Sequence, residues 1–214
     1  MFSNKDLRKL IIPLVIEQLL AVTIGMADTV MVSSCGEAAV SGISLVDSIN
    51  FLLITLFSSL ATGGAVIASQ YIGRGDHKSA SLAAKQLFYA SLALSAVLGV
   101  IAVFFRRPVL NMVFGSIEAD VMAHAQIYFL LSAISYPFLA VYNAGAALFR
   151  SMGDSRTTML ISILMNTINI VGNAILIYGF QMAAAGAAAA SLVSRAVGAI
   201  IITVLLLNPR RNIF

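Results

Sequence analysis

Long apolar runs alternate with short polar segments along the whole chain. Runs of mostly apolar residues fall at about 10–32, 46–71, 82–105, 121–148, 158–178 and 183–207. Each run is close to the roughly 20 residues that an α-helix needs to cross the hydrocarbon core of a bilayer. The intervening segments are short and contain glycine, proline, serine or charged residues. This pattern predicts an all-α, polytopic membrane protein in which residues 1–214 form a single bundle of six transmembrane helices.

The composition supports the same class of protein. Hydrophobic residues make up 60% of the chain and charged residues only 10%, whereas soluble domains are about 25% charged. This balance argues against a soluble enzyme, a nucleic-acid-binding module and a disordered protein. No protease, hydrolase or phosphate-loop motif occurs, so we expect neither an enzyme nor a cofactor. The lipid bilayer is the expected surrounding, and no nucleic-acid partner is expected.

The basic residues predict the orientation in the membrane. Lys and Arg on alternate sides of the six runs number ten against two, and the two are Arg106 and Arg107. Because cytoplasmic loops are enriched in Lys and Arg, this asymmetry predicts a multi-pass protein of the cytoplasmic membrane with both termini in the cytoplasm.

Local motifs predict how the helices begin and pack. Asp76 and Asp154 each follow a glycine and precede an apolar run, which is typical of helix N-caps. In the last run, small residues recur every fourth position, namely Gly186, Ala190, Ser194 and Gly198. Such a stripe favours close helix packing, with a groove facing substrate as the alternative.

Two carboxylates in the first run need an explanation, because ionisable groups inside a bilayer are costly. Glu17 and Asp28 are 11 residues apart, so they share a helix face at a separation of about 16 Å. They are candidates for a cation site or a proton relay. The alternative is that they are protonated or hydrogen-bonded groups that hold helices together, and Glu17 also lies near enough to the cytoplasmic end to reach that interface.

Amide side chains form a second polar feature. Asn166, Asn169 and Asn173 lie on one stripe of the fifth run. Three amides on one face suit a cation, a carboxyl partner or interhelical hydrogen bonds, and the sequence leaves these alternatives open. Further candidates for a polar cavity lining are Asn143, Tyr136 and Gln70.

Several longer segments resemble one known family. From Pro13 the first run and the turn after it read PLVIEQLLAVTIGMADTVMVSSCGEAAVSGISL, and the second run ends SQYIGRGDHKSA. Residues 143–159 read NAGAALFRSMGDSRTTM, and the fifth run includes NTINIVGNAILIYGF. In this order, over the whole chain, these segments are similar to the N-terminal half of multidrug and toxic compound extrusion (MATE) transporters.

The resemblance implies an antiporter in which inward flow of sodium or protons drives export of small organic, often cationic, drugs or toxic compounds. It implies that Asp28 binds the coupling ion, as the metal ligand if that ion is sodium, and that Asn169 and Asn173 complete the site, with Glu17 as a further candidate. Some family members have Asp where this chain has Asn173. The family has two six-helix lobes, so a second lobe is expected as a partner, either covalently attached or as a second copy.

Two other functions remain open at this stage. The same two-lobe shape would serve a flippase for lipids or lipid-linked precursors, and a membrane subunit that transports nothing would need neither Asp28 nor the amide stripe. The sequence also leaves open the choice between sodium and proton, and whether the chain is a fragment or a half-size protein.

Overall fold

The computed structural model describes residues 4–207, without the side chains of residues 4–7, 9, 21, 24 and 27. Over this range the chain forms helices and no strands, which confirms the predicted all-α class. The helices are α1 (Asn4–Ser33), α2 (Glu37–Gly73), α3 (His77–Phe104), α4 (Arg106–Phe114), α5 (Ala119–Ser151), α6 (Ser155–Asn173) and α7 (Ala183–Leu206). A six-residue π-helical segment, η1 (Ala174–Gly179), continues α6 toward α7.

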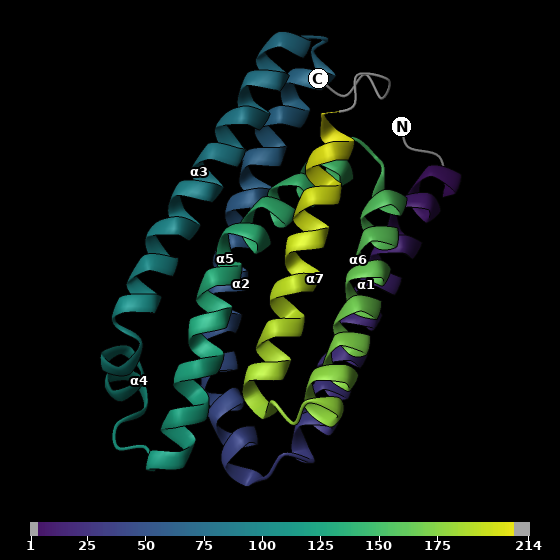
Figure 1. The fold of residues 1–214 in the computed structure, drawn as a ribbon. Helices are drawn as coiled ribbons and strands as arrows, with labels where there is room; N and C mark the ends of the chain where they lie inside the picture. The colour runs from purple at the N-terminus through teal and green to yellow at the C-terminus, as the bar shows by residue number, and fades with distance from the viewer. Residues whose placement is uncertain (1–3, 208–214) are drawn as a thin grey trace.

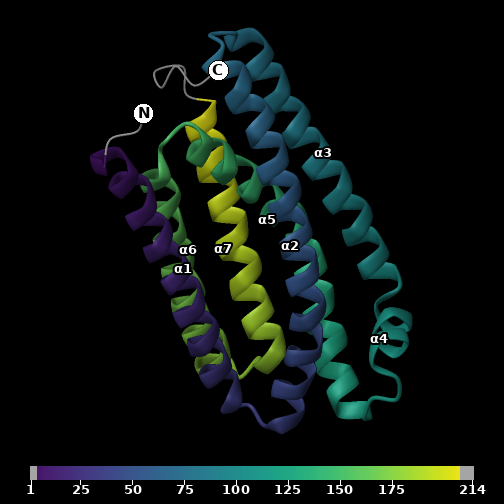
Figure 2. The ribbon, with the colours of Figure 1, turned by 180° about the vertical axis from the view of Figure 1, so that it is seen from behind.

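The six long helices run alongside one another along the length of the molecule (Figure 1). α1 lies beside α6 at one side, α2 and α3 lie at the other, and α5 and α7 lie between them (Figures 1 and 2). Five of the six are long and apolar enough to cross a membrane. α1 is 30 residues long, and its most apolar part is the shorter segment Leu10–Leu20, which includes Glu17. The six-helix membrane bundle is thus confirmed, and α1 is the one long helix of the described range that is not among these five candidates.

The structure corrects the sequence prediction at three places. α2 begins at Glu37, nine residues before the predicted start at 46. The segment after the third run, expected to be a loop, contains the additional helix α4, which Leu110 holds against the core with its side chain fully buried. Pro108 is tolerated because it falls in the first turn of α4, where backbone N–H groups have no helical partner. The fifth predicted span ends in the π-helical turns of η1.

The turns α2–α3 and α5–α6 lie at one end of the bundle, together with the first turn of α1 and the last turn of α7 (Figure 1). Both predicted N-caps are confirmed there. Asp76 accepts a hydrogen bond from the backbone N–H of Ser79 at 3.0 Å, and Asp154 accepts one from that of Thr157 at 3.1 Å. Hydrogen bonds from the hydroxyl and the backbone amide of Ser79 lower the pKa of Asp76, so this cap persists until the pH falls below the ordinary range of an aspartate.

Small residues let the helices approach closely. A Cβ atom added to Gly42 of α2 would lie 2.9 Å from both the backbone N of Ala125 and the backbone O of Val121 in α5. On α7, the predicted stripe of Gly186, Ala190, Ser194 and Gly198 is buried, and Ala190 packs against Gly172 of α6. Close helix packing is therefore confirmed as the role of the stripe.

Gly42→Ala should destabilise the α2–α5 contact, because the added methyl group meets backbone atoms that cannot move aside as a side chain would. We expect the free energy of unfolding to fall by about 1–3 kcal/mol. The matched control is Gly63→Ala on the same helix, where an added Cβ meets nothing within 4 Å. It should be neutral or stabilising, by about 0.5–1 kcal/mol. Thermal unfolding of both variants in nanodiscs measures the difference, and equal effects would contradict the packing argument.

Candidate functional site

A buried polar cluster joins α1 to α6 and α7 in the half of the bundle away from the capped turns. The half-buried Asp28 of α1 faces α6, and the Nδ2 atom of Asn173 donates a hydrogen bond to its Oδ1 at 2.6 Å. The hydrogen-bond partners of Asn169 decide which way its amide group is turned. Its nitrogen faces both carboxylate oxygens of Asp28, at 3.0 and 3.3 Å. Its oxygen accepts a hydrogen bond from the hydroxyl of Ser191 in α7 at 3.0 Å. The resemblance to the family implied that these three residues belong to one site, and the structure brings them together.

The amides of this cluster are almost completely removed from solvent. Asn173 is fully buried and Asn169 is 6% exposed. The Oδ1 atom of Asn173 has no hydrogen-bond partner among the described residues. A buried polar atom without a partner is unusual and costs free energy, so it calls for an explanation such as a bound ion or proton donor. The cluster has an unused oxygen ligand next to its carboxylate.

The helical register explains why the two amides converge on Asp28. Residues 169 and 173 are one α-helical turn apart, so their side chains share a face. The α-helical hydrogen-bonding pattern ends at Asn173, and the π-helical η1 begins directly after it. Single π-helical turns often occur at functional sites, because the wider turn redirects the residues that follow.

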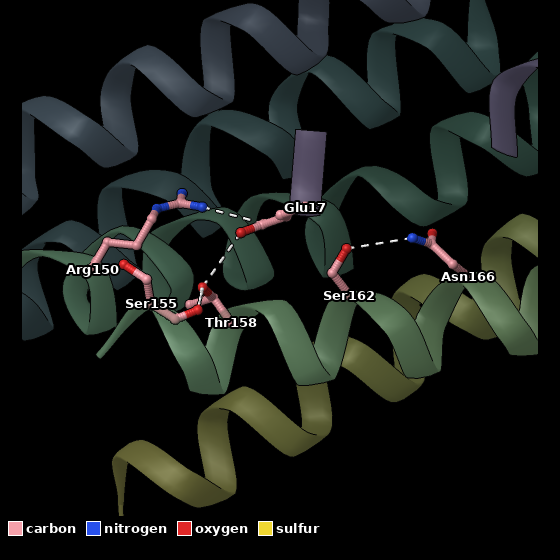
Figure 3. A network of polar contacts seen from close by, with 6 residues as sticks. All are labelled: Glu17, Arg150, Ser155, Thr158, Ser162 and Asn166. Carbon is pink, nitrogen blue, oxygen red and sulfur yellow. Dashed lines mark hydrogen bonds and ion pairs between the residues drawn. The ribbon is translucent and has the colours of Figure 1, made fainter. Parts of the chain in front are cut away.

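The third amide of the predicted stripe is separate from this cluster. Asn166 donates a hydrogen bond to Ser162, one turn earlier on α6, at 3.4 Å. Figure 3 shows this pair on α6, next to a different network around Glu17. The structure therefore divides the stripe into an interior pair at Asp28 and a separate residue.

Glu17 takes part in that second network, which lies toward the capped turns. Its Oε1 atom pairs with the guanidinium of Arg150 at the end of α5 at 3.3 Å, and its Oε2 accepts a hydrogen bond from Thr158 of α6 at 3.4 Å (Figure 3). Thr158 also donates to the backbone carbonyl of Ser155 at 2.9 Å. Glu17 thus links α1 to α5 and α6, and it is not brought together with Asp28.

The predicted cavity-lining residues are dispersed. Tyr136 is fully buried between α5 and α2, where its hydroxyl donates to Oδ1 of Asn50 at 2.8 Å and its ring packs against Phe57 at a centroid distance of 6.1 Å. Asn143 is partly buried, with an amide nitrogen that has no partner among the described residues. Gln70 is exposed near the end of α2.

Sequence reasoning missed a third carboxylate. Asp47 of α2 accepts hydrogen bonds from the hydroxyl of Tyr128 at 2.9 Å and from the amide of Asn50 at 3.3 Å. Arg195 of α7 donates to the hydroxyl of Ser135 in α5 at 2.7 Å. The charges of Asp47 and Arg195 both act on Asp28. Because α2 begins at Glu37, Asp47 lies ten residues inside a membrane helix, and the apolar run from Ala38 to Val46 was the signal that could have placed it there.

These features define a class of protein: a multi-pass helical membrane protein with an interior site of a carboxylate and amides, as transporters have. Comparison with known proteins gives the family. The MatE family model matches residues 13–175. The uncharacterized transporter YisQ of Bacillus subtilis is 32% identical over 210 residues, which are 92% of this chain and 44% of YisQ. The probable multidrug resistance protein NorM of Thermotoga maritima is 31% identical over 94% of this chain and 44% of its own length.

Solved structures agree with these matches. The outward-facing conformation of a multidrug resistance MATE family transporter of the MOP superfamily has a TM-score of 0.89 over 96% of this chain and 45% of that one, at 24% identity, which shows the shared fold. A MOP superfamily transporter from Pyrococcus furiosus has a TM-score of 0.83 at 27% identity. The chain belongs to the MATE family of membrane transporters. It spans a little under half the length of the relatives it matches, as one lobe of a two-lobe transporter would.

Glu17→Gln should destabilise the lobe. It removes the charge that pairs with Arg150, whose side chain is 27% exposed, while that of Glu17 is 11% exposed. Since the pair is partly exposed, we expect a loss of about 1–2 kcal/mol, less than for a fully buried pair. Thermal unfolding in nanodiscs provides the measurement. The double variant Glu17→Gln/Arg150→Gln should recover part of the loss, and a single variant as stable as wild type would show that the ion pair contributes nothing.

Proposed function

We propose that this chain is the N-terminal lobe of a cation-coupled antiporter that exports small organic, often cationic, drugs or toxic compounds across the cytoplasmic membrane. The multidrug resistance proteins among its relatives support the export of drugs. The lobe pairs with a second six-helix lobe, since transporters built from repeats bind substrate between their halves. The Lys and Arg asymmetry supports cytoplasmic termini, although two of the basic residues counted, Arg210 and Arg211, lie outside the described residues.

The observation that supports ion coupling most directly is the Asp28 cluster. An ionised Asp28 accepts the N–H groups of Asn169 and Asn173, as described above. A proton or a sodium ion on the carboxylate removes acceptor capacity. An amide then gains by turning its oxygen toward the site, where it accepts the new O–H group or ligates the sodium ion. The unpartnered Oδ1 of Asn173 is the oxygen available for this step.

This exchange changes the contact between α1 and α6. In the ionised state two amides of α6 donate to α1, and in the ion-loaded state at least one of them accepts instead. If the donating arrangement is favoured in one of the inward-facing and outward-facing conformations and the accepting arrangement in the other, the ion binds the two conformations with different affinities. It then shifts the equilibrium between them by that difference in binding free energy. With Asn at position 173 the cluster has one carboxylate, so it takes up one positive charge in this step.

Asp28→Asn should abolish the dependence of transport on the ion gradient, because the variant has no charge for the ion to neutralise. In membranes that contain the complete transport assembly, we expect gradient-driven efflux of an organic cation to fall by about 5–150-fold, the usual range of a coupling factor. Efflux at unchanged ion dependence would contradict the proposal.

Asn173→Ala should weaken both the lobe and its ion response, because it removes a hydrogen bond to a charged group and the unpartnered oxygen. We expect a loss of about 1.5–3 kcal/mol in unfolding free energy and a shifted ion concentration at half-maximal efflux. Asn166→Ala is the matched control, since the one side-chain hydrogen bond that Asn166 donates among the described residues goes to Ser162 of its own helix. The two variants are compared by thermal unfolding and by efflux at graded ion concentrations. An equal ion response in both variants would show that Asn173 does not take part in ion binding.

A further inference from the structure

Asp47 is an exposed carboxylate at membrane depth that the proposed ion step does not use. It lies ten residues after the start of α2, about 15 Å along the helix. A carboxylate at this depth must face protein or a water-filled cavity and not lipid. Both of its hydrogen bonds, from Tyr128 and from Asn50, end on Oδ1. Among the described side chains none donates to Oδ2, so Asp47 is oriented through one oxygen and leaves the other free.

No basic group pairs directly with Asp47. Arg195 acts on it electrostatically, but the hydrogen bond of its guanidinium goes to Ser135, and no described Lys or Arg side chain lies within salt-bridge distance of Asp47. The local balance is two carboxylates, Asp28 and Asp47, against the one cation Arg195. When Asp28 and Asp47 are both ionised, these three side chains together therefore have one uncompensated negative charge.

The surface of α2 around Asp47 is exposed and carries further polar side chains. Exposed residues with hydroxyl groups continue along the same edge of the helix at helical spacing, namely Ser44, Thr55, Ser58 and Thr62. Asp47 interacts electrostatically with Asp28 of α1 and Arg195 of α7, so this edge of α2 faces those helices. α1 and α2 lie on either side of α7 (Figure 2).

An aromatic side chain lies next to the carboxylate on this edge. Phe51 is four residues after Asp47, hence one turn along the same face, and is 70% exposed. Aromatic rings attract organic cations through their π faces and bury their apolar parts. Among the described residues no group of three or more His, Cys, Asp or Glu exists that could hold a metal ion. One free carboxylate oxygen beside an exposed ring therefore suits a single organic cation better than an inorganic ion.

We propose that Asp47, oriented by Tyr128 and Asn50 and flanked by Phe51, binds the positively charged centre of an organic cation. This inference rests on the proposed antiport function and assigns its substrate a residue. It also supplies a coupling mechanism. A proton or sodium ion on Asp28 leaves Arg195 to neutralise Asp47, which weakens the attraction for the organic cation. Because coupling between two sites is reciprocal, the bound organic cation lowers the affinity of Asp28 for the proton or sodium ion by the same factor.

The test measures equilibrium binding of tetraphenylphosphonium, a permanent organic cation, to the complete transport assembly in nanodiscs. Asp47→Asn should weaken binding by about thirtyfold or more, as removal of one partner of a desolvated charge pair does. Ser48→Ala is the matched control, because Ser48 is also exposed and its hydroxyl, within the described part of the chain, bonds only to the carbonyl of Ser44 in its own helix. Asp28→Asn removes the negative charge as ion binding does, so this variant should bind tetraphenylphosphonium with the weaker affinity of the ion-loaded wild type, and that affinity should no longer depend on ion concentration. Wild-type affinity in the Asp47→Asn variant would overturn the assignment.

A second measurement needs no substitution and stays valid if Asp47→Asn does not fold. A carbodiimide with an amine nucleophile labels accessible carboxyl groups, and mass spectrometry quantifies the label on Asp47. Tetraphenylphosphonium should protect Asp47 of the wild-type assembly, whereas sodium chloride at the same concentration should not. Absence of protection would overturn the inference.

The outcomes separate the two proposals. If tetraphenylphosphonium binds with an ion dependence that requires Asp28 but not Asp47, the antiport proposal is supported and the Asp47 assignment is wrong. If binding requires Asp47 but its ion dependence persists in Asp28→Asn, the substrate site is supported and the ion site is wrong. A wild-type assembly that does not bind tetraphenylphosphonium overturns the Asp47 inference.

Discussion

The requirement that a carboxylate inside a membrane be solvated by protein groups governs the arrangement of this lobe. Water is scarce at that depth, so Asp28 depends on donors from neighbouring helices. Asn169 and Asn173 supply them, and Ser191 in turn orients Asn169. α6 must therefore lie beside α1, and the small residues of α7 that let it approach α6 place Ser191 within reach.

α1 is held at two separate levels by different kinds of interaction. Toward the capped turns, Glu17 forms an ion pair with Arg150, which is a closed arrangement in which both charges have partners. Toward the other end, the hydrogen-bond partners of Asp28 among the described residues are amides, and one amide oxygen remains unused. The first arrangement suits a fixed attachment and the second a site whose hydrogen bonds can be exchanged. A helix attached at one end and switchable at the other is suited to small movements about its fixed end.

Much of this could be predicted from the sequence because membrane helices have a simple signal. Six apolar runs and two aspartate caps follow from spacing and composition, whereas the convergence of Asp28 with the amides of α6 was implied by the resemblance to the family. The Glu17–Arg150 pair could not, because it joins residues 133 positions apart and depends on how α1 meets the end of α5. α4 is only nine residues long and begins with two arginines, so it lacks the apolar length that marks a span. Asp47 falls at the second position of the predicted 46–71 run, where a charged residue resembles the interfacial end of a span.

The position of Asp28 along α1 also has an electrical consequence. Asp28 lies five residues before the end of α1 at Ser33, about 8 Å along the helix axis. In the proposed orientation, an ion arriving from outside crosses only about a quarter of the roughly 30 Å hydrocarbon layer before it binds. Each full elementary charge moved across a membrane at 100 mV corresponds to about 2.3 kcal/mol. Most of the work available from the membrane voltage is therefore done after the ion has bound, while the loaded lobe changes conformation.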